Sequence, residues 1–289
     1  MPVTSDAGPA NVFAEERQDF IARIVEEHGR ATVADLASRF AVSRVTIRKD
    51  LATLEGQRRL VRTHGGAVAI GRGAERAFDV RERIQRAAKD EIGREAAAGV
   101  VDGESIALDA STTALALARH LKARGSWLHL TVITNGLRIA SELAGHPGIT
   151  VAMPAGFVRW EALSLVGPLG AGLFDKVNVQ KAFMGAAGFA IDAGLSDATE
   201  EEAQIKRLMV EHATEVVGLV DHTKWGRTAF ATFCRTADVT SVVSDVDAPA
   251  AMVAELRRSG VDVRLVEPRE PHPGRPEHQG LRTGGPAPW

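Results

Sequence analysis

The sequence predicts an α/β protein with two domains: a small helical domain with a β-hairpin, then a larger domain built on a mainly parallel sheet. Apolar residues at helical spacing and a Gly-Gly turn lie within residues 14–70. A highly charged stretch follows, and from about residue 89 short β-rich runs alternate with helical segments. Such alternation favours a parallel sheet covered by helices on both faces.

The composition is that of an ordinary globular protein and limits the classes of function. Lys and Arg number 35 and Asp and Glu 37, so the formal net charge is −2 and any signal for a polyanionic partner must be local. The single cysteine, Cys234, excludes an intramolecular disulfide and a multi-cysteine metal site. The start of the chain lacks a signal peptide, and charges interrupt every apolar stretch. We therefore expect a cytoplasmic protein without a membrane partner.

Composition also divides the chain. We expect a disordered lead-in at 1–13, the small domain at 14–70, a charged linker at 71–88, the larger domain at 89–267 and a disordered tail at 268–289. The tail holds six Pro and four Gly without periodicity, which is typical of disorder.

The small domain has the organisation of a DNA-binding motif. Helices are predicted at 14–28, after Thr32 and at about 44–56, with Thr32 and Ser43 as N-caps. A short turn joins the last two, and RRLVRTHGGAVAI then predicts a hairpin around Gly-Gly. Three helices and a hairpin in this order indicate a winged helix-turn-helix, whose second short helix enters the major groove of DNA.

Positive charge is concentrated on that helix and the hairpin. Between residues 39 and 64 there are seven basic and two acidic side chains, as a phosphate-rich partner requires. The alternative is a solvated amphipathic helix, and His64 could equally cap the turn. The candidate contacts to double-stranded DNA are Thr32, Ser43, Arg44, Thr46, Arg48, Lys49, Arg58, Arg62 and His64.

Polar residues follow three strands of the predicted sheet. Ligands of open α/β sheets bind beyond the carboxyl ends of strands, and a Ser/Thr-rich turn at a helix N-terminus suits a phosphate. Alternatively, these residues are ordinary helix caps, and Asp109 and Asp221 either accept sugar hydroxyls or are structural caps. The candidates for binding a phosphorylated small molecule are Asp109, Ser111, Thr112, Thr113, Asn135, Gly136, Lys206, Asp221 and Lys224.

The stretch TVADLASRFAVSRVTIRKDLATLEGQRRLVRTHGGAV resembles the N-terminal signature of the DeoR family of bacterial transcription regulators. The resemblance implies that the basic helix reads an operator. The matching positions are Val42, Ser43, Thr46, Ile47, Arg48, Asp50, Leu51, Arg62, Thr63, His64, Gly65, Gly66 and Ala67.

Residues from about 89 to 267 resemble the C-terminal sensor domain of the same family, which is related in fold to ribose-phosphate isomerases and typically binds a sugar phosphate. This resemblance adds Thr134 to the candidates, through a Thr-Asn motif. The motifs of the family appear as Asp109-Ala110-Ser111-Thr112-Thr113, Thr134-Asn135, Glu202-Ala203-Gln204-Ile205-Lys206 and Asp221-His222-Thr223-Lys224-Trp225-Gly226.

Two positions depart from the family pattern. Ser111 stands where glycine is common, which adds a hydroxyl and restricts the backbone. Phe157 stands in place of the second glycine of a usual Gly-Gly pair after the third strand. We therefore expect a bulky ring at the rim of the ligand site.

The alternatives are a sugar-phosphate isomerase with an attached DNA-binding domain, and a second domain that only oligomerises. The related isomerases place acidic residues after the central strand, where residues 185–188 here read Gly-Ala-Ala-Gly. The three glutamates at 200–202 are more typical of a helix start. We predict no catalytic residues, no metal site and no cofactor. The interpretation is a homo-oligomeric regulator, most often a repressor in this family, of carbohydrate-metabolism genes, with operator DNA and a phosphorylated sugar as partners.

Overall fold

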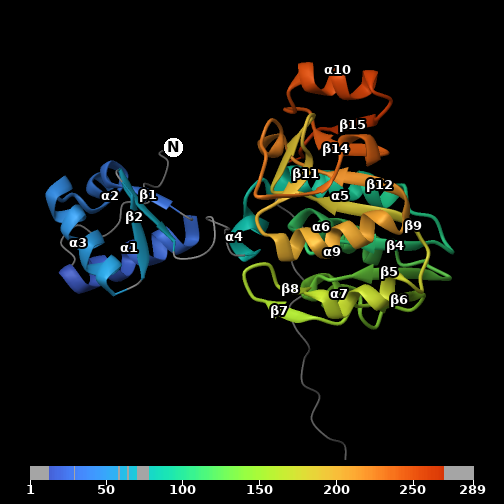
Figure 1. The fold of residues 1–289 in the computed structure, drawn as a ribbon, viewed down its shortest axis with the longest axis horizontal. Helices are drawn as coiled ribbons and strands as arrows, with labels where there is room; N and C mark the ends of the chain where they lie inside the picture. Colours follow the sequence, from blue (N-terminus) through green and yellow to red (C-terminus); the bar gives the residue numbers. More distant parts are fainter. Residues whose placement is uncertain (1–12, 29, 58, 64, 70–77, 270–289) are drawn as a thin grey trace, which may run out of the picture.

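The computed structural model (Figure 1) describes residues 13–28, 30–57, 59–63, 65–69 and 78–269. The predictions for Arg58, His64, nearly all of the lead-in, the first part of the linker and most of the tail lie outside these residues. Within the described residues, no helix combines the length and the apolarity needed to cross a membrane.

The N-terminal domain confirms the three predicted helices and the hairpin. Its sheet is antiparallel, in the order β1-β3-β2, and β1 was not predicted because three residues are too few to show an alternating pattern. The elements are α1 (Ala14–His28), β1 (Arg30–Thr32), α2 (Val33–Phe40), α3 (Arg44–Gly56), β2 (Leu60–Thr63) and β3 (Gly66–Ala69).

Capping residues and the turn between them determine where α2 and α3 begin and where α2 ends. Thr32 and Ser43 are the N-caps: each side-chain oxygen accepts a hydrogen bond, at 3.1 Å, from a backbone amide three residues on. Ala41 takes a left-handed conformation (φ 51°) and so ends α2 within the turn. Gly66 permits the close approach of β3 to β1, because a side chain there would fall on the carbonyl oxygen of Ala31.

The C-terminal domain is built on a seven-stranded sheet in which every neighbouring pair is parallel. All seven strands were predicted. In spatial order they are β15 (Asp262–Val266), β14 (Ser241–Asp245), β12 (Ala213–Leu219), β9 (Val179–Gly185), β4 (Ser105–Leu108), β5 (Leu130–Thr134) and β6 (Ile149–Ala152).

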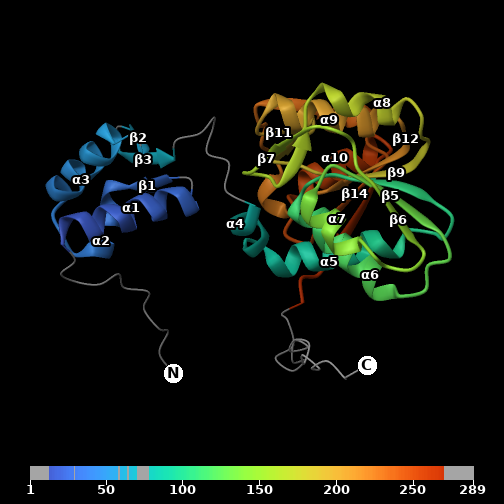
Figure 2. The same cartoon turned by 90° about the horizontal axis from the view of Figure 1, so that it is seen from below.

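Helices cover both faces of this sheet, as the alternation predicted. Apolar residues of α5, α6 and α7 form one core with the sheet, and those of α9 and α10 form the other. Figure 2 shows α9 and the pair α5 and α6 on opposite sides of the strands. These helices are α5 (Arg86–Ala98), α6 (Thr112–Arg124), α7 (Leu137–Leu143), α9 (Glu200–Glu211) and α10 (Ala250–Arg258).

Several smaller elements had no prediction. An antiparallel hairpin and a three-stranded antiparallel sheet in the order β10-β11-β13 lie outside the main sheet. They are short and contain few alternating residues. They comprise β7 (Phe157–Arg159) and β8 (Ser164–Val166), then β10 (Gly188–Ala190), β11 (Gly194–Asp197) and β13 (Ala231–Cys234), with the short helix α8 (Ala171–Phe174) between the two groups.

The end of the predicted linker is structured. Residues 78–88 form α4 (Phe78–Arg83) and the start of α5, and Phe78 is buried in the core shared by α5 and α6. The high charge of the stretch concealed this one large apolar residue. Residues 78–88 therefore pack with the second domain, which corrects their assignment to a linker.

Candidate functional site

A cavity of about 620 Å³ lies at the carboxyl ends of the central strands β4, β9 and β12. This is the edge where ligands of open α/β sheets bind. Charged side chains of both signs line it. The basic ones are Arg81, Lys89, Lys206, Lys224 and Arg227, and the acidic ones are Asp197, Glu202 and Asp221.

The N-terminus of α6 forms one wall. Ser111 is the N-cap, and its Oγ accepts a hydrogen bond from the amide of Ala114 at 3.0 Å. Thr112 and Thr113 follow, and all three residues line the cavity. Ser111 packs directly over Gly185, where a side chain would collide with it. The hydroxyl that distinguishes this chain from the family pattern is therefore used to cap the helix, beside a glycine that makes room for it.

Lys206 occupies an acidic part of the wall. Its Nζ lies 2.5 Å from Oδ2 of both Asp109 and Asp197 and donates to the carbonyl of Gly185 at 3.1 Å. Burial alone would lower the pKa of Lys206, but the surrounding carboxylates outweigh it and raise that pKa. Burial alone would raise the pKa of the Asp197 carboxyl, but the charge of Lys206 outweighs burial and lowers that pKa. Lys206 was predicted as a counter-charge for a ligand; the structure instead pairs it with two carboxylates, and Asp109 supports it from behind the wall.

Glu202 also faces the cavity. Its Oε1 accepts a hydrogen bond from Ser164 Oγ and lies 3.4 Å from Arg159 Nη1. Burial raises the pKa of the Glu202 carboxyl, and the nearby Asp197 adds to the shift. The sequence interpretation had treated this residue as part of an acidic helix start. The structure makes it a buried acceptor in the wall.

Lys89 was missed by the sequence analysis, and it lines the basic part of the cavity. Its side chain is only 6% exposed, and Nζ donates to the carbonyl of Arg81 at 2.5 Å. Among the described residues, no carboxylate lies within ion-pair distance of it. Burial lowers the pKa of Lys89 to about 8; the charges of Lys224 and Arg81 also lower it, and that of Asp221 opposes them. The signal in the sequence was a lysine on the same helical face as Ile92 and Ala96.

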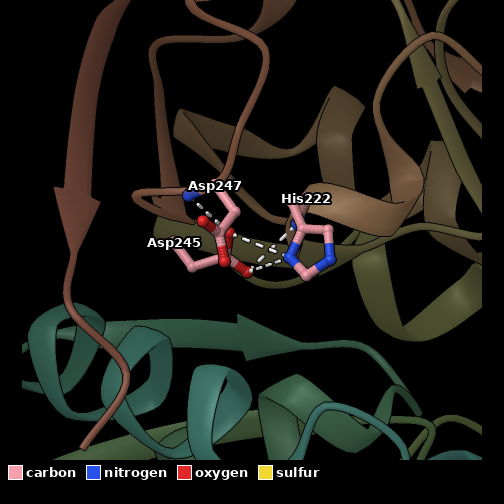
Figure 3. A group of neighbouring side chains, drawn as sticks. All are labelled: His222, Asp245 and Asp247. Atoms are coloured by element: carbon pink, nitrogen blue, oxygen red, sulfur yellow. Dashed lines mark hydrogen bonds and ion pairs between the residues drawn. The ribbon is translucent and has the colours of Figure 1, made fainter.

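The loop after β12 brings Asp221 and Lys224 to the cavity. Asp221 caps the 3₁₀-helix η2 (His222–Lys224), and its Oδ1 accepts from the amide of Thr223 at 3.0 Å. Asp245, fully buried at the end of β14, accepts from both the amide and Nδ1 of His222 at 3.1 Å (Figure 3). Asp245 therefore clamps the loop.

His222, Asp245 and Asp247 place potential ligand atoms within 4.8 Å of one another, so this group is the one to consider for a metal ion (Figure 3). Asp245 Oδ1 also accepts from the amide of Asp247 at 3.2 Å. The bonds that Asp245 receives from its own loops account for its burial. The geometry thus supports a structural role for the group.

Thr134, Asn135 and Gly136 are not part of the cavity lining. Thr134 Oγ1 accepts from the amide of Gly136 at 3.0 Å, and the carbonyl and Nδ2 of Asn135 bond the backbone of Leu165. The turn therefore anchors β8, whose Ser164 bonds Glu202 in the wall. The prediction that these three residues contact the ligand directly does not agree with this placement.

Phe157 also lies outside the cavity lining. Its ring is 65% exposed on β7 and does not line the cavity. The expectation of a bulky ring at the rim was therefore wrong. A departure from a family motif shows that a side chain has changed. Whether that side chain reaches the rim of the cavity depends on how the hairpin of β7 and β8 folds.

In the N-terminal domain, α3 presents Arg44, Arg48 and Lys49 to solvent. Within the described part of the chain, none of the three has an acidic side chain within ion-pair distance. The opposite side of α3 is fixed to α1 by the buried Asp50, whose Oδ2 lies 2.7 Å from Arg17 Nε. The three cations are thus exposed, and their contact with DNA stays a prediction.

The other predicted contacts in this domain have structural partners. The hydroxyls of Ser43 and Thr46 lie 2.9 Å apart, and Thr32 Oγ1 donates to Asp35 Oδ2 at 2.7 Å. Arg62, on the wing formed by β2 and β3, lies 3.6 Å from Glu55. Because it stays partly exposed, it could exchange this surface pair for a phosphate.

A winged helix-turn-helix joined to an α/β domain with a polar cavity at its strand ends defines a class: transcription regulators with a ligand-sensing domain. Residues 17–72 match the family model of the DeoR-like helix-turn-helix domain, and residues 84–246 match that of the DeoR C terminal sensor domain. The chain belongs to the DeoR family of transcription regulators.

Relatives match over nearly their whole length. The HTH-type transcriptional regulator GolR of Listeria innocua is 35% identical, covering 89% of this chain and 100% of that one. The HTH-type transcriptional repressor GlcR of Bacillus subtilis is 32% identical, covering 90% and 99%. These relatives are named as regulators and not as enzymes, and the chain is a regulator too.

Among solved structures, a ribose 5-phosphate isomerase of Methanocaldococcus jannaschii matches with a TM-score of 0.35 and 20% identity, over 47% of this chain and 53% of that one. This similarity is too low to support a functional inference.

Proposed function

We propose that the chain represses carbohydrate-metabolism genes and that a phosphorylated sugar bound in the cavity sets its affinity for operator DNA. The observation that supports the ligand class most directly is Lys89. It is a buried lysine with no carboxylate within ion-pair distance among the described residues, and Lys224 and Arg81 line the same cavity. Like charges in a buried wall are costly unless an anion joins them.

The rest of the wall fits the same ligand. The first turn of α6 offers backbone amides, the helix dipole and the hydroxyls of Thr112 and Thr113 to a phosphate. The acidic part, with Asp197 and Glu202, offers acceptors for sugar hydroxyls. Ala186 and Ala187 line the cavity after β9, so this part of the wall offers no ionisable side chain to a ligand.

The DNA-binding part of the proposal rests on the exposed Arg44, Arg48 and Lys49 at the start of α3. Arg can hydrogen-bond guanine with two donors, and Lys can neutralise phosphates and release counterions. One small module gives a limited interface with DNA, so we propose that the protein acts as a homo-oligomer on a double-stranded operator. The relative GlcR is a transcriptional repressor by name, which supports repression over activation.

The test is thermal melting of the purified protein against pentose, hexose and glycerol phosphates, each beside its unphosphorylated parent. A ligand that binds the native state raises the melting temperature by mass action. The proposal expects a shift from at least one phosphate and none from its parent sugar. Equal shifts from both would contradict the assignment of the phosphate to the basic wall.

A further inference from the structure

Helix α4 is the first described element after the DNA-binding domain and also part of the cavity. Residues 70–77 separate it from the end of β3. Arg81 and Ile84, in and just after α4, line the cavity together with Lys89 of α5. The chain that arrives from the DNA-binding domain therefore meets the ligand site before it enters the main sheet.

A buried ring and ion pairs near the surface hold α4 against the sensor domain. Phe78 is buried in the domain core, and Glu82 lies 2.6 Å from Arg119 of α6. Asp79 lies 3.5 Å from Arg138 of α7 in a more exposed pair. Exposed ion pairs of this kind contribute little to stability. Among the residues of α4, Phe78 is the buried one, and the junction with α5 fixes the other end of the helix.

The junction between α4 and α5 is tightly bent. Gln85 takes a left-handed conformation (φ 53°), which is uncommon for a residue other than glycine. Across this bend, Lys89 Nζ donates to the carbonyl of Arg81. An ammonium has three donors, so Lys89 can keep this bond and still donate to an anion in the cavity.

Three cations of the cavity come from three separate elements: Arg81 from α4, Lys89 from α5 and Lys224 from η2. Carboxylates of the same wall offset these charges in part, since Asp197 interacts with Arg81 and Asp221 with Lys89. An anion placed among the three cations attracts all of them at once, and so draws α4 toward the rest of the cavity. A ligand shifts an equilibrium only through different affinities for its two states, and here only the docked state includes Arg81.

We propose that a phosphate group in the cavity clamps α4 onto the sensor domain by joining Arg81 to Lys89 and Lys224, and that the docking of α4 transmits ligand binding toward the DNA-binding domain. This inference rests on the proposed function of the cavity and adds its means of regulation. The ligand acts on the end of the connection between the domains, at the point where that connection reaches the sensor domain.

Hydrogen exchange of the full-length protein tests the clamp, with inorganic phosphate as the probe and chloride at matched ionic strength as the reference. Amides of residues 78–84 and of the first turn of α6 are followed in separate peptides. We expect phosphate to slow exchange in both segments, by roughly 5-fold or more at α4. In Arg81→Met, phosphate should still protect the first turn of α6 but no longer α4.

The outcomes separate the clamp from the function of the cavity. Protection of the α6 turn with unchanged exchange at α4 in the wild-type protein would overturn the clamp and leave the phosphate site standing. No response in either segment would overturn both. Lys224→Met serves as the second variant: it should weaken the phosphate response of both segments together, each compared with the same variant in chloride.

Discussion

Lys206 Nζ lies 2.5 Å from Asp197 Oδ2 within the wall of the cavity, and both side chains are buried. Asp109 is a second carboxylate at the same distance from that ammonium. Attraction between buried charges is strong, and so is the cost of leaving one of them unpaired. The pairing therefore makes Lys206 a structural support of the ligand site.

Lys206→Met should accordingly destabilise the sensor domain by ~3–5 kcal/mol, because two buried carboxylates lose their counter-charge. Urea unfolding followed by tryptophan fluorescence measures this, since all four tryptophans lie between residues 127 and 289. Lys122→Met is the matched control. Lys122 pairs with Glu142 at the surface, 2.9 Å away, and its loss should cost below ~1 kcal/mol. Equal costs for both variants would refute the structural role.

The pKa of Lys89 predicts how anion affinity depends on pH. Burial lowers this pKa to about 8, so the side chain is mostly charged at neutral pH and mostly neutral above pH 8. An anion binds the charged form, so affinity should fall as pH rises through 8. With sulfate, which stays a dianion over this range, the affinity should drop roughly fourfold from about pH 7 to about pH 8.5. Lys89→Met should bind weakly and remove the dependence; an equally steep profile in that variant would assign the titration to another group.

Asp245→Asn should loosen the loop that presents Asp221 and Lys224, because an amide offers one acceptor oxygen to the amide and ring of His222 where the carboxylate offers two. We expect weaker phosphate binding in calorimetry with little loss of DNA binding. Asp247→Asn is the control, since Asp247 is exposed and contributes only its backbone amide to the bonds of Asp245. If Asp247→Asn weakened phosphate binding equally, the bonds between Asp245 and His222 would not explain how the loop is held.

Arg48→Ala should weaken binding to DNA selected from a random library by the wild-type protein. The expected loss is ~1–3 kcal/mol if Arg48 bonds a guanine with two donors, and preference at that base should relax. If Arg48 instead contacts a phosphate, the salt dependence of binding should fall by about one counterion without a change in preference. Fluorescence anisotropy measures both, with the exposed Arg235→Ala of the sensor domain as control. Unchanged affinity and salt dependence would remove Arg48 from the interface.

The sequence predicted the helices and strands that have a long apolar pattern or a recognisable capping residue. The three N-terminal helices, the hairpin and all seven parallel strands were predicted, because apolar periodicity and residues such as Ser43 mark them locally. The short strands β1, β7 and β10 were not, since three residues show no period. Phe78 was overlooked because one buried ring does not change the composition of a charged stretch.

The candidate site could be predicted where it depends on residues at the ends of strands. Ser111, Thr112 and Thr113 line the cavity because the carboxyl end of β4 must meet the same edge as those of its neighbours. Lys89 and Arg81 were missed because they reach the cavity from helices that precede the first strand of the sheet. Lys206 was expected to face a ligand, but pairing with two carboxylates is a tertiary relationship that spacing along the chain does not reveal.

The central claim is that a phosphorylated ligand in the cavity changes the affinity for operator DNA. The most direct test measures DNA affinity with and without a phosphate ester that stabilises the protein in thermal melting, in the wild type and in Lys224→Met. A coupling of ~1–3 kcal/mol predicts a change of roughly 5- to 150-fold in the wild type, and Lys224→Met should bind the same DNA without that response. DNA affinity that ignores every stabilising ligand, or a full response in Lys224→Met, would contradict the account.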